Sequence, residues 1–229
     1  ERNLHFASAS GDVRKITDGK HNLNISDINQ NGTAVGTLSD PHLPGDVVLL
    51  SLSNPDPLRL THVNDDVLAD VTLGELEDFW YESVDGWQVQ GFIVKPPGFD
   101  PSQKYPLVLS IHGGPHSMST FGFNFSFQNF AANDYVVLYT NPRGSTGYGE
   151  EFANGIDNAY PGKDHDDLMH GVDEVLRRGY VDEDNLFIMG CSGGGTLTAW
   201  AITQTDRFAG ASARCPITNW ISFVGTTDG

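Results

Sequence analysis

The sequence predicts an α/β protein, in which a parallel sheet with flanking helices follows a run of short β-strands. The continuous apolar runs at 107–111 and 135–139 are typical of central parallel strands, which are buried on both faces. Between such runs the chain shows a helical spacing of apolar residues, as at 168–178. Strands that alternate with helices through short loops indicate a parallel sheet.

The first part of the chain, before the hairpin described below, has a different pattern. Short β-like segments recur at a spacing of roughly ten residues and are separated by turn residues such as Asn31-Gly32. These segments are 4–8, 24–28, 33–38, 47–52 and 58–63. The spacing is typical of four-stranded propeller blades or of a sandwich, and the stretch is too short to form either alone.

The remaining elements follow in order along the chain. A hairpin is predicted at 79–84 and 89–94 around Asp85-Gly86. The predicted strands after it are 107–111, 135–139, 186–189 and 209–213, and the predicted helices are 168–178, 196–202 and the opening of one at 219–224. Two acidic runs, 164–167 and 182–184, are interpreted as helix-start and loop residues, because acidic side chains complement a helix N-terminus.

The composition limits the classes of partner and cofactor. The formal net charge of −17 argues against nucleic acid and anionic membrane as partners. No apolar run approaches the ~20 residues of a membrane-spanning helix. The histidines and cysteines do not have zinc-site spacing, so we expect no metal and no cofactor. The two cysteines, Cys191 and Cys215, are expected to be reduced thiols rather than a disulfide.

The motif most informative about chemistry is Gly190-Cys191-Ser192-Gly193-Gly194, a G-x-S-x-G sequence between an apolar run and a helix-like stretch. In that context the motif is a nucleophile elbow, a sharp turn that exposes the central serine hydroxyl above the carboxyl edge of a sheet. Ser192 is therefore the predicted catalytic nucleophile. A thiol nucleophile at Cys191 is the alternative. Because an elbow presents its central residue, Cys191 is instead expected to be a small buried side chain.

A second motif, His112-Gly113-Gly114-Pro115, follows the strand predicted at 107–111. It resembles the loop whose backbone N–H joins the N–H after the nucleophile to form an oxyanion hole. Such donors stabilise the negative charge that develops on the carbonyl oxygen, and losing one typically costs ~10²–10³ in rate. The predicted oxyanion donors are the backbone N–H groups of Gly193 and Gly114, with Gly113 the next candidate.

Three further residues near these motifs have predicted structural roles. His112 is expected to shape its loop through backbone hydrogen bonds rather than to act as a base. The glycine-rich segment 141–149 lacks the phosphate-loop pattern, and its Arg143 is expected to order the loop through a carboxylate or carbonyl partner. Tyr148 either lines the pocket or fills the core.

Several ordered motifs make residues 76–229 similar to the prolyl oligopeptidase family of serine peptidases, specifically its acylaminoacyl-peptidase and dipeptidyl-peptidase-like branch. The motifs lie at 91–99, 105–116, 141–149, 190–195 and 215–228. The resemblance implies that residues 1–75 are the C-terminal part of a β-propeller and that residues 76–229 are the N-terminal part of an α/β-hydrolase peptidase domain. It also implies Ser192 as nucleophile, Gly114 and Gly193 as oxyanion donors, and a triad Asp and His further along the chain.

The predicted function is therefore hydrolysis of short peptides by a serine peptidase through an acyl-enzyme. All eight histidines precede Ser192, whereas in this architecture the acid and the base follow the serine. The chain is interpreted as an internal fragment that lacks the triad Asp and His and is inactive alone. Homo-oligomerisation is left open. The alternatives are a carboxylesterase of the same fold, since acyl transfer to water needs the same parts, and a catalytically inactive propeller–hydrolase binding module.

Overall fold

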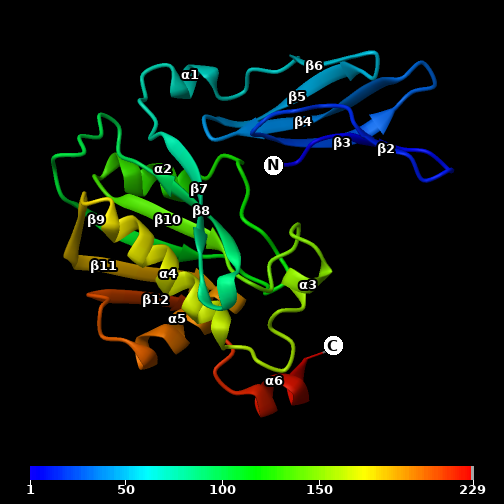
Figure 1. The fold of residues 1–229 in the computed structure, drawn as a ribbon. Coiled ribbons are helices and arrows are strands. Elements are labelled where there is room, and N and C mark those ends of the chain that lie inside the picture. The colour runs from blue at the N-terminus through cyan, green and yellow to red at the C-terminus, as the bar shows by residue number, and fades with distance from the viewer. Residues whose placement is uncertain (228–229) are drawn as a thin grey trace. The chain divides into compact units, whose positions relative to one another are not determined.

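The structure, a computed structural model, describes residues 1–227 of the chain. Its contacts divide the chain into two units with separate hydrophobic cores. The first unit contains residues 1–73 and 120–128, and the second contains residues 74–119 and the chain from residue 129 onward. Figure 1 labels the elements of both units.

The first unit is built from antiparallel strands. β1 pairs with β2, and β3 to β6 form a four-stranded meander in which each strand pairs with the next. Alternate side chains of β3, β4 and β5 form its core, as expected where one face of a sheet is buried: Leu23, Ala34, Val48 and Leu50. The elements are β1 (His5–Ala7), β2 (Val13–Lys15), β3 (Asn22–Ile28), β4 (Thr33–Asp40), β5 (Leu43–Ser51), β6 (Asn54–Arg59) and α1 (Asp65–Leu68).

The second unit contains a six-stranded sheet in the order β12-β11-β9-β10-β8-β7. Strands β9 to β12 are parallel, while β8 runs antiparallel to β10 and β7 antiparallel to β8. The predicted parallel sheet is present, and the predicted hairpin extends it as an antiparallel edge, so the sheet as a whole is mixed. The strands are β7 (Leu76–Glu82), β8 (Gln88–Val94), β9 (Tyr105–Ile111), β10 (Val136–Asn141), β11 (Val181–Cys191) and β12 (Gly210–Arg214).

Two helices, α4 (Lys163–Arg177) and α5 (Gly193–Gln204), cover one face of this sheet. Both share a core with alternate residues of the central strand β9, namely Leu107, Leu109 and Ile111. Helix α4 packs against β7, β8, β10 and β11, and α5 packs against β9, β11 and β12. Because α5 starts directly after β11, its packing fixes the turn between them above the carboxyl ends of the parallel strands.

The structure differs from the sequence prediction in several places. Helices α2 (Phe125–Ala132) and α3 (Glu150–Ala153) and strand β2 were not predicted. Helix α4 begins before residue 168, so the acidic run at 164–167 lies inside its first turns. The second acidic run, expected in a loop, lies within β11, where the pairing with β9 shifts register between Val181 and Leu186. Short helices and irregular strand ends depend on tertiary contacts, which local sequence patterns do not report.

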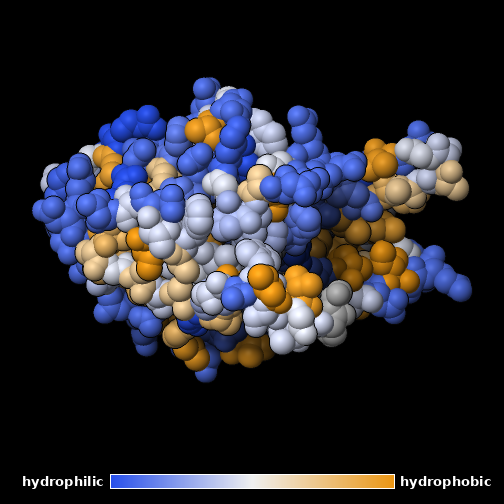
Figure 2. Space-filling model, turned by 90° about the horizontal axis from the view of Figure 1, so that it is seen from below, coloured by the Kyte–Doolittle hydropathy of each residue, from blue (hydrophilic) through white to orange (hydrophobic). Residues whose placement is uncertain are grey.

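The last described helix, α6 (Trp220–Thr226), leaves apolar side chains exposed. Its N-cap is Asn219, whose side chain accepts a hydrogen bond from the backbone N–H of Ser222. The exposed side chains are Trp220, Ile221, Phe223 and Val224. Figure 2, a view from below Figure 1, shows hydrophobic residues exposed among hydrophilic ones on that face. None of the helices in residues 1–227 has the length and hydrophobicity needed to cross a bilayer.

Candidate active site

The turn between β11 and α5 presents Ser192 to solvent. Ser192 is exposed and has φ 57° and ψ −123°, a conformation that L-residues rarely adopt and that costs of order 1–3 kcal/mol. Its backbone N–H donates to the Arg214 carbonyl at 3.0 Å, and its carbonyl accepts from the Thr196 N–H at 2.9 Å. The backbone on both sides of the serine is therefore held while its side chain stays accessible.

Glycines make this turn sterically feasible. A Cβ on Gly190 would overlap the carbonyl of Gly194, and a Cβ on Gly194 would overlap the carbonyls of Ile111 and His112. The first contact packs the residues two before and two after the serine directly against each other. The second joins the turn to the end of β9, so the elbow rests directly on the 112–114 loop.

The 112–114 loop lies beside Ser192, as the sequence predicts for an oxyanion loop. A Cβ on Gly193 would overlap the backbone of Gly114, and a Cβ on Gly113 would lie 3.7 Å from the Ser192 Cβ. Gly193 is the first residue of α5, so its N–H has no partner inside the helix. The structure thus brings together Ser192, Gly193 and Gly114, the three predicted site residues.

His112 contacts both its own loop and the loop after β10. Its Nδ1 lies 2.7 Å from the Gly113 carbonyl, which can only accept, and its Nε2 lies 3.0 Å from the Ser145 hydroxyl. Burial lowers the pKa of the His112 imidazole, although its hydrogen bond to the Gly113 carbonyl acts in the opposite direction. Both ring nitrogens are engaged away from Ser192, so the expected loop-shaping role agrees with the geometry. Within residues 1–227 the Ser192 hydroxyl has no hydrogen-bond partner.

Tyr160, which the sequence analysis did not single out, contacts the elbow from another side. Its hydroxyl donates to the Gly193 carbonyl at 2.9 Å, and burial raises its pKa well above that of an exposed tyrosine. Tyr160 also lines an open hollow of about 290 Å³, together with Ile156, Asn158, Ala159 and Trp220. No short motif marks Tyr160, because its role depends on the folding of the 154–162 loop onto α5.

A buried ion pair orders the loop after β10. Asp167 is fully buried and accepts from the Arg143 backbone N–H at 2.8 Å and from its Nε and Nη2, both at 2.9 Å. The Ser83 hydroxyl also donates to Asp167, at 2.5 Å. The Arg143 guanidinium stacks over the Trp87 ring, 4.7 Å from its centroid. Asp167 is thus the carboxylate partner that was predicted for Arg143. Because only 3% of the Arg143 side chain is exposed, it is not placed to anchor a substrate.

Tyr148 lies in the same loop and is predicted either to line the pocket or to fill the core. It is half-buried, donates to Gln90 Oε1 at 2.6 Å and accepts from Asn141 Nδ2 at 2.6 Å. Burial raises the pKa of its hydroxyl to about 12. These contacts tie the loop to β8 and β10.

The expectation that Cys191 is buried is wrong. Cys191 is half-buried, and its Sγ lies 2.7 Å from the Sγ of the exposed Cys215. Among residues 1–227, the strand beside β11 on this side is β12, whose residues are largely exposed. Both cysteines are free thiols, as predicted from the sequence.

Within the described part of the chain no group of three or more His, Cys, Asp or Glu side chains is arranged to hold a metal ion.

Comparison with known proteins identifies the chain's relatives. The model of the prolyl oligopeptidase family matches residues 121–229. The chain is 36% identical over 227 residues to an uncharacterized peptidase, YuxL, of Bacillus subtilis. This alignment covers 98% of this chain and 34% of YuxL. It is 30% identical over 222 residues to dipeptidyl-peptidase 5 of Porphyromonas gingivalis, covering 96% of this chain and 32% of the relative. The chain belongs to the prolyl oligopeptidase family.

Solved structures agree with this membership in the prolyl oligopeptidase family. The chain superposes on the acylaminoacyl peptidase of Pyrococcus horikoshii with a TM-score of 0.88 at 28% identity, over 99% of this chain and 36% of that one. This likeness confirms the predicted fold class, a partial α/β-hydrolase sheet preceded by strands of a propeller. The chain spans about a third of the length of the two curated relatives, at 34% and 32%.

We expect the Arg143→Met substitution to destabilise the protein by about 3–5 kcal/mol, because it leaves the buried Asp167 carboxylate without its charged partner. Arg177→Met is the matched control, since Arg177 is exposed and pairs with Glu174 at the surface, where an ion pair contributes roughly 0–1 kcal/mol. Urea unfolding of both variants measures the difference. Equal losses in the two variants would contradict the assignment.

A second prediction concerns Asp164, in the first turn of α4. Burial raises the pKa of its carboxyl from 3.8 to about 6, although its Oδ1 accepts from the Gly162 N–H at 2.5 Å. The folded state therefore binds this proton more tightly than the unfolded state, so its contribution to stability is complete below pH 3.8 and is lost as the pH rises through 6.

We therefore expect Asp164→Asn to remove this loss. The stability of the variant relative to wild type should rise by about 3 kcal/mol at most between pH 3.5 and pH 7. Asp166→Asn, in the same helical turn but only half-buried, is the control. Thermal unfolding at several pH values measures the difference, and a constant gap between Asp164→Asn and wild type across this range would refute it.

Proposed function

We propose that the protein is a serine peptidase that hydrolyses short peptides, with Ser192 as the nucleophile. The observation that carries the proposal is the exposed Ser192, held at φ 57° on a strand–turn–helix with Gly114 packed against Gly193. The peptidase relatives support it. So does a solved acylaminoacyl peptidase in complex with Z-Gly-Gly-Phe-chloromethyl ketone, which matches this chain with a TM-score of 0.88 at 28% identity.

The reaction follows from this geometry. The Ser192 Oγ attacks the carbonyl carbon of the scissile peptide bond while a general base accepts its proton. In this proposal the N–H groups of Gly193 and Gly114 stabilise the negative charge that develops on the carbonyl oxygen. The intermediate expels the amine, protonated by the same base acting as an acid, and leaves an acyl-enzyme. Water, deprotonated by the base, then attacks the acyl carbon and releases Ser192.

The base and its orienting acid are proposed to lie outside residues 1–229. His112 is committed to Gly113 and Ser145, and the Ser192 hydroxyl has no partner among the described residues. In the α/β-hydrolase order the acid and the histidine follow the nucleophile. The curated relatives are about three times as long as this chain, which leaves room for both residues.

The hollow beside Tyr160 is proposed to receive a side chain of the substrate. It adjoins the residue after the nucleophile, because Tyr160 donates to the Gly193 carbonyl. Tyr160 and Trp220 give it an aromatic lining, whereas the Asn158 side chain adds a polar group. The lining therefore offers both aromatic surface and polar groups. A substrate side chain with an apolar body and a polar group fits this lining.

The domain assignment is part of the same proposal. Residues 1–75 form the C-terminal part of a β-propeller, and residues 76–229 the N-terminal part of the peptidase domain. The antiparallel meander β3 to β6 has the four strands of one propeller blade. A propeller in front of the peptidase domain would restrict access to short or unstructured peptides.

The nucleophile is tested by labelling the full-length protein with a fluorophosphonate, which reacts with activated serines. We expect Ser192→Ala to lose the label, because no other side chain occupies the tip of the turn. Ser212→Ala is the control, since Ser212 is an exposed serine on the neighbouring strand β12 and should not be required. Labelling of Ser192→Ala as strong as that of wild type would refute the assignment. Comparison of peptide anilides with short acyl esters then separates a peptidase from an esterase.

The missing base leads to a further prediction. Residues 1–229 alone should hydrolyse a peptide anilide no faster than their Ser192→Ala variant, because a serine without a base is a poor nucleophile. Release of the aniline product, followed by absorbance, measures this rate. Robust, Ser192-dependent turnover by residues 1–229 would show that the base lies within this chain.

A further inference from the structure

The two cysteines of the chain meet at the elbow. Cys191 is the last residue of β11 and directly precedes Ser192, and Cys215 directly follows β12. These parallel strands pair with Cys191 opposite Arg214, so Cys215 continues from the neighbouring position. The two Sγ atoms lie 2.7 Å apart. The sequence has only these two cysteines, and the fold brings them together across 24 positions of chain.

The backbone around the pair is well held. The Ser192 N–H donates to the Arg214 carbonyl at 3.0 Å, which fixes the strand ends beside each other. Cys215 then leaves the sheet with φ 41°, a left-handed conformation that turns the chain at this point. Two residues later, the Ile217 N–H donates to the Thr196 Oγ1 at 2.9 Å, in the first turn of α5. The strand pairing and the contact with α5 thus hold the two sulfur atoms opposite each other.

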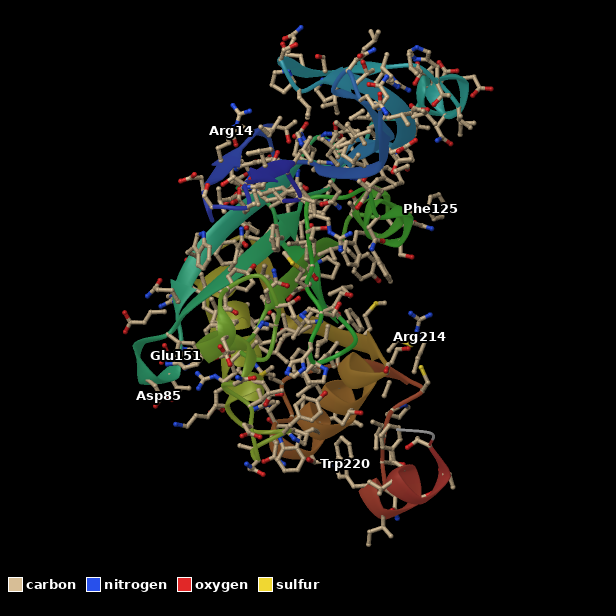
Figure 3. The ribbon with its side chains drawn as sticks, turned by 90° about the vertical axis from the view of Figure 1, so that its right-hand side faces the viewer. Arg14, Asp85, Phe125, Glu151, Arg214 and Trp220 are labelled. Carbon is tan, nitrogen blue, oxygen red and sulfur yellow. The ribbon has the colours of Figure 1, made fainter. Side chains whose placement is uncertain are left out.

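The pair is accessible and differs in reactivity. Within residues 1–227, Cys215 is exposed and Cys191 is half-buried, so Cys215 is the more accessible thiol of the two. The hydrogen bond from the Cys191 thiol lowers the pKa of Cys215 and correspondingly raises that of Cys191. Arg214, whose side chain projects at the surface in Figure 3, adds a positive charge beside them. The thiolate is the reactive form of cysteine, so Cys215 is the attacking thiol of the pair.

We propose that Cys191 and Cys215 form a dithiol site that peroxides oxidise to an intramolecular disulfide next to Ser192. The Cys215 thiolate attacks one oxygen of hydrogen peroxide, the O–O bond breaks, and hydroxide leaves a sulfenic acid on Cys215. The Cys191 sulfur then attacks the Cys215 sulfur, the S–O bond breaks, and the oxygen leaves as water with the Cys191 proton. The balance is two thiols and one peroxide to one disulfide and two waters.

This inference goes beyond the proposed function and does not depend on it. The disulfide would connect the residue before Ser192 to the segment that carries Ile217 onto α5, so its direct effect is to cross-link the elbow. A cross-link between residues this far apart restricts the unfolded chain and raises the thermal midpoint. Neither thiol is needed for the attack of Ser192 on a carbonyl, so failure of one proposal leaves the other intact.

The test uses the purified full-length protein under native conditions, first reduced with dithiothreitol and then treated with hydrogen peroxide. Trypsin cleaves after Arg178, Arg207 and Arg214, which places the two cysteines in different peptides. We expect mass spectrometry to find these peptides joined without reductant and separate with it. We also expect oxidation to raise the thermal midpoint by roughly 5 °C or more in wild type and not in Cys191→Ser or Cys215→Ser.

The single variants distinguish the roles of the two thiols. In Cys191→Ser, oxidation should stop at a Cys215 sulfenic acid that dimedone traps, because no second thiol is present to displace the oxygen. In Cys215→Ser, Cys191 should react more slowly with peroxide. Joined peptides that appear only between two protein molecules, or two thiols that remain alkylatable after peroxide treatment, would overturn the proposal. Equal rates for the two single variants would overturn the assignment of Cys215 as the attacking thiol.

Discussion

The site depends on backbone packed directly on backbone around Ser192. Gly190, Gly193 and Gly194 have no side chains, so the strand before the serine, the helix after it and the loop at 112–114 approach more closely than any Cβ would allow. Each of these contacts positions one part of the proposed machinery. The contact between Gly190 and Gly194 turns the chain sharply enough to expose the serine, and the contact between Gly193 and Gly114 brings the two proposed donors together. A single added methyl group would force these elements apart.

A second constraint is the buried carboxylate of Asp167. The Asp167 carboxylate accepts hydrogen bonds from Arg143 and Ser83, and the Tyr81 hydroxyl donates to its backbone carbonyl at 2.8 Å. One buried acid thereby joins helix α4, the loop after β10 and the end of β7. Its satisfied hydrogen bonds make the arrangement specific, because a buried charge is tolerated only with its partners in place. Ser145 lies in the same loop as Arg143, and its hydroxyl is 3.0 Å from His112 Nε2. This contact connects the loop after β10 to the 112–114 loop.

The sequence reveals the parts of this site that short motifs encode. Ser192, Gly193 and Gly114 were predicted because glycine spacing around a strand end reports a sharp turn and a close backbone approach. The central strands were predicted because residues such as Leu109 and Leu138 form continuous apolar runs. Tyr160 and Asp167 could not be predicted in their roles, since their partners are 33 and 24 positions away and nothing local marks them. The contact of Cys191 with Cys215 was missed for the same reason: it follows from the pairing of β11 with β12.

The strand order of the sheet has a consequence for the synthesis of the protein. Central strand β9 pairs on one side with β11, and Leu107 aligns with Leu186. A ribosome that adds roughly 5–20 residues per second needs several seconds to make the chain between these two partners. Throughout that interval one edge of an apolar strand has open hydrogen-bonding groups, which are a template for pairing with other chains. The rate of translation and the chaperones that meet the nascent chain therefore influence how much of it reaches the native sheet.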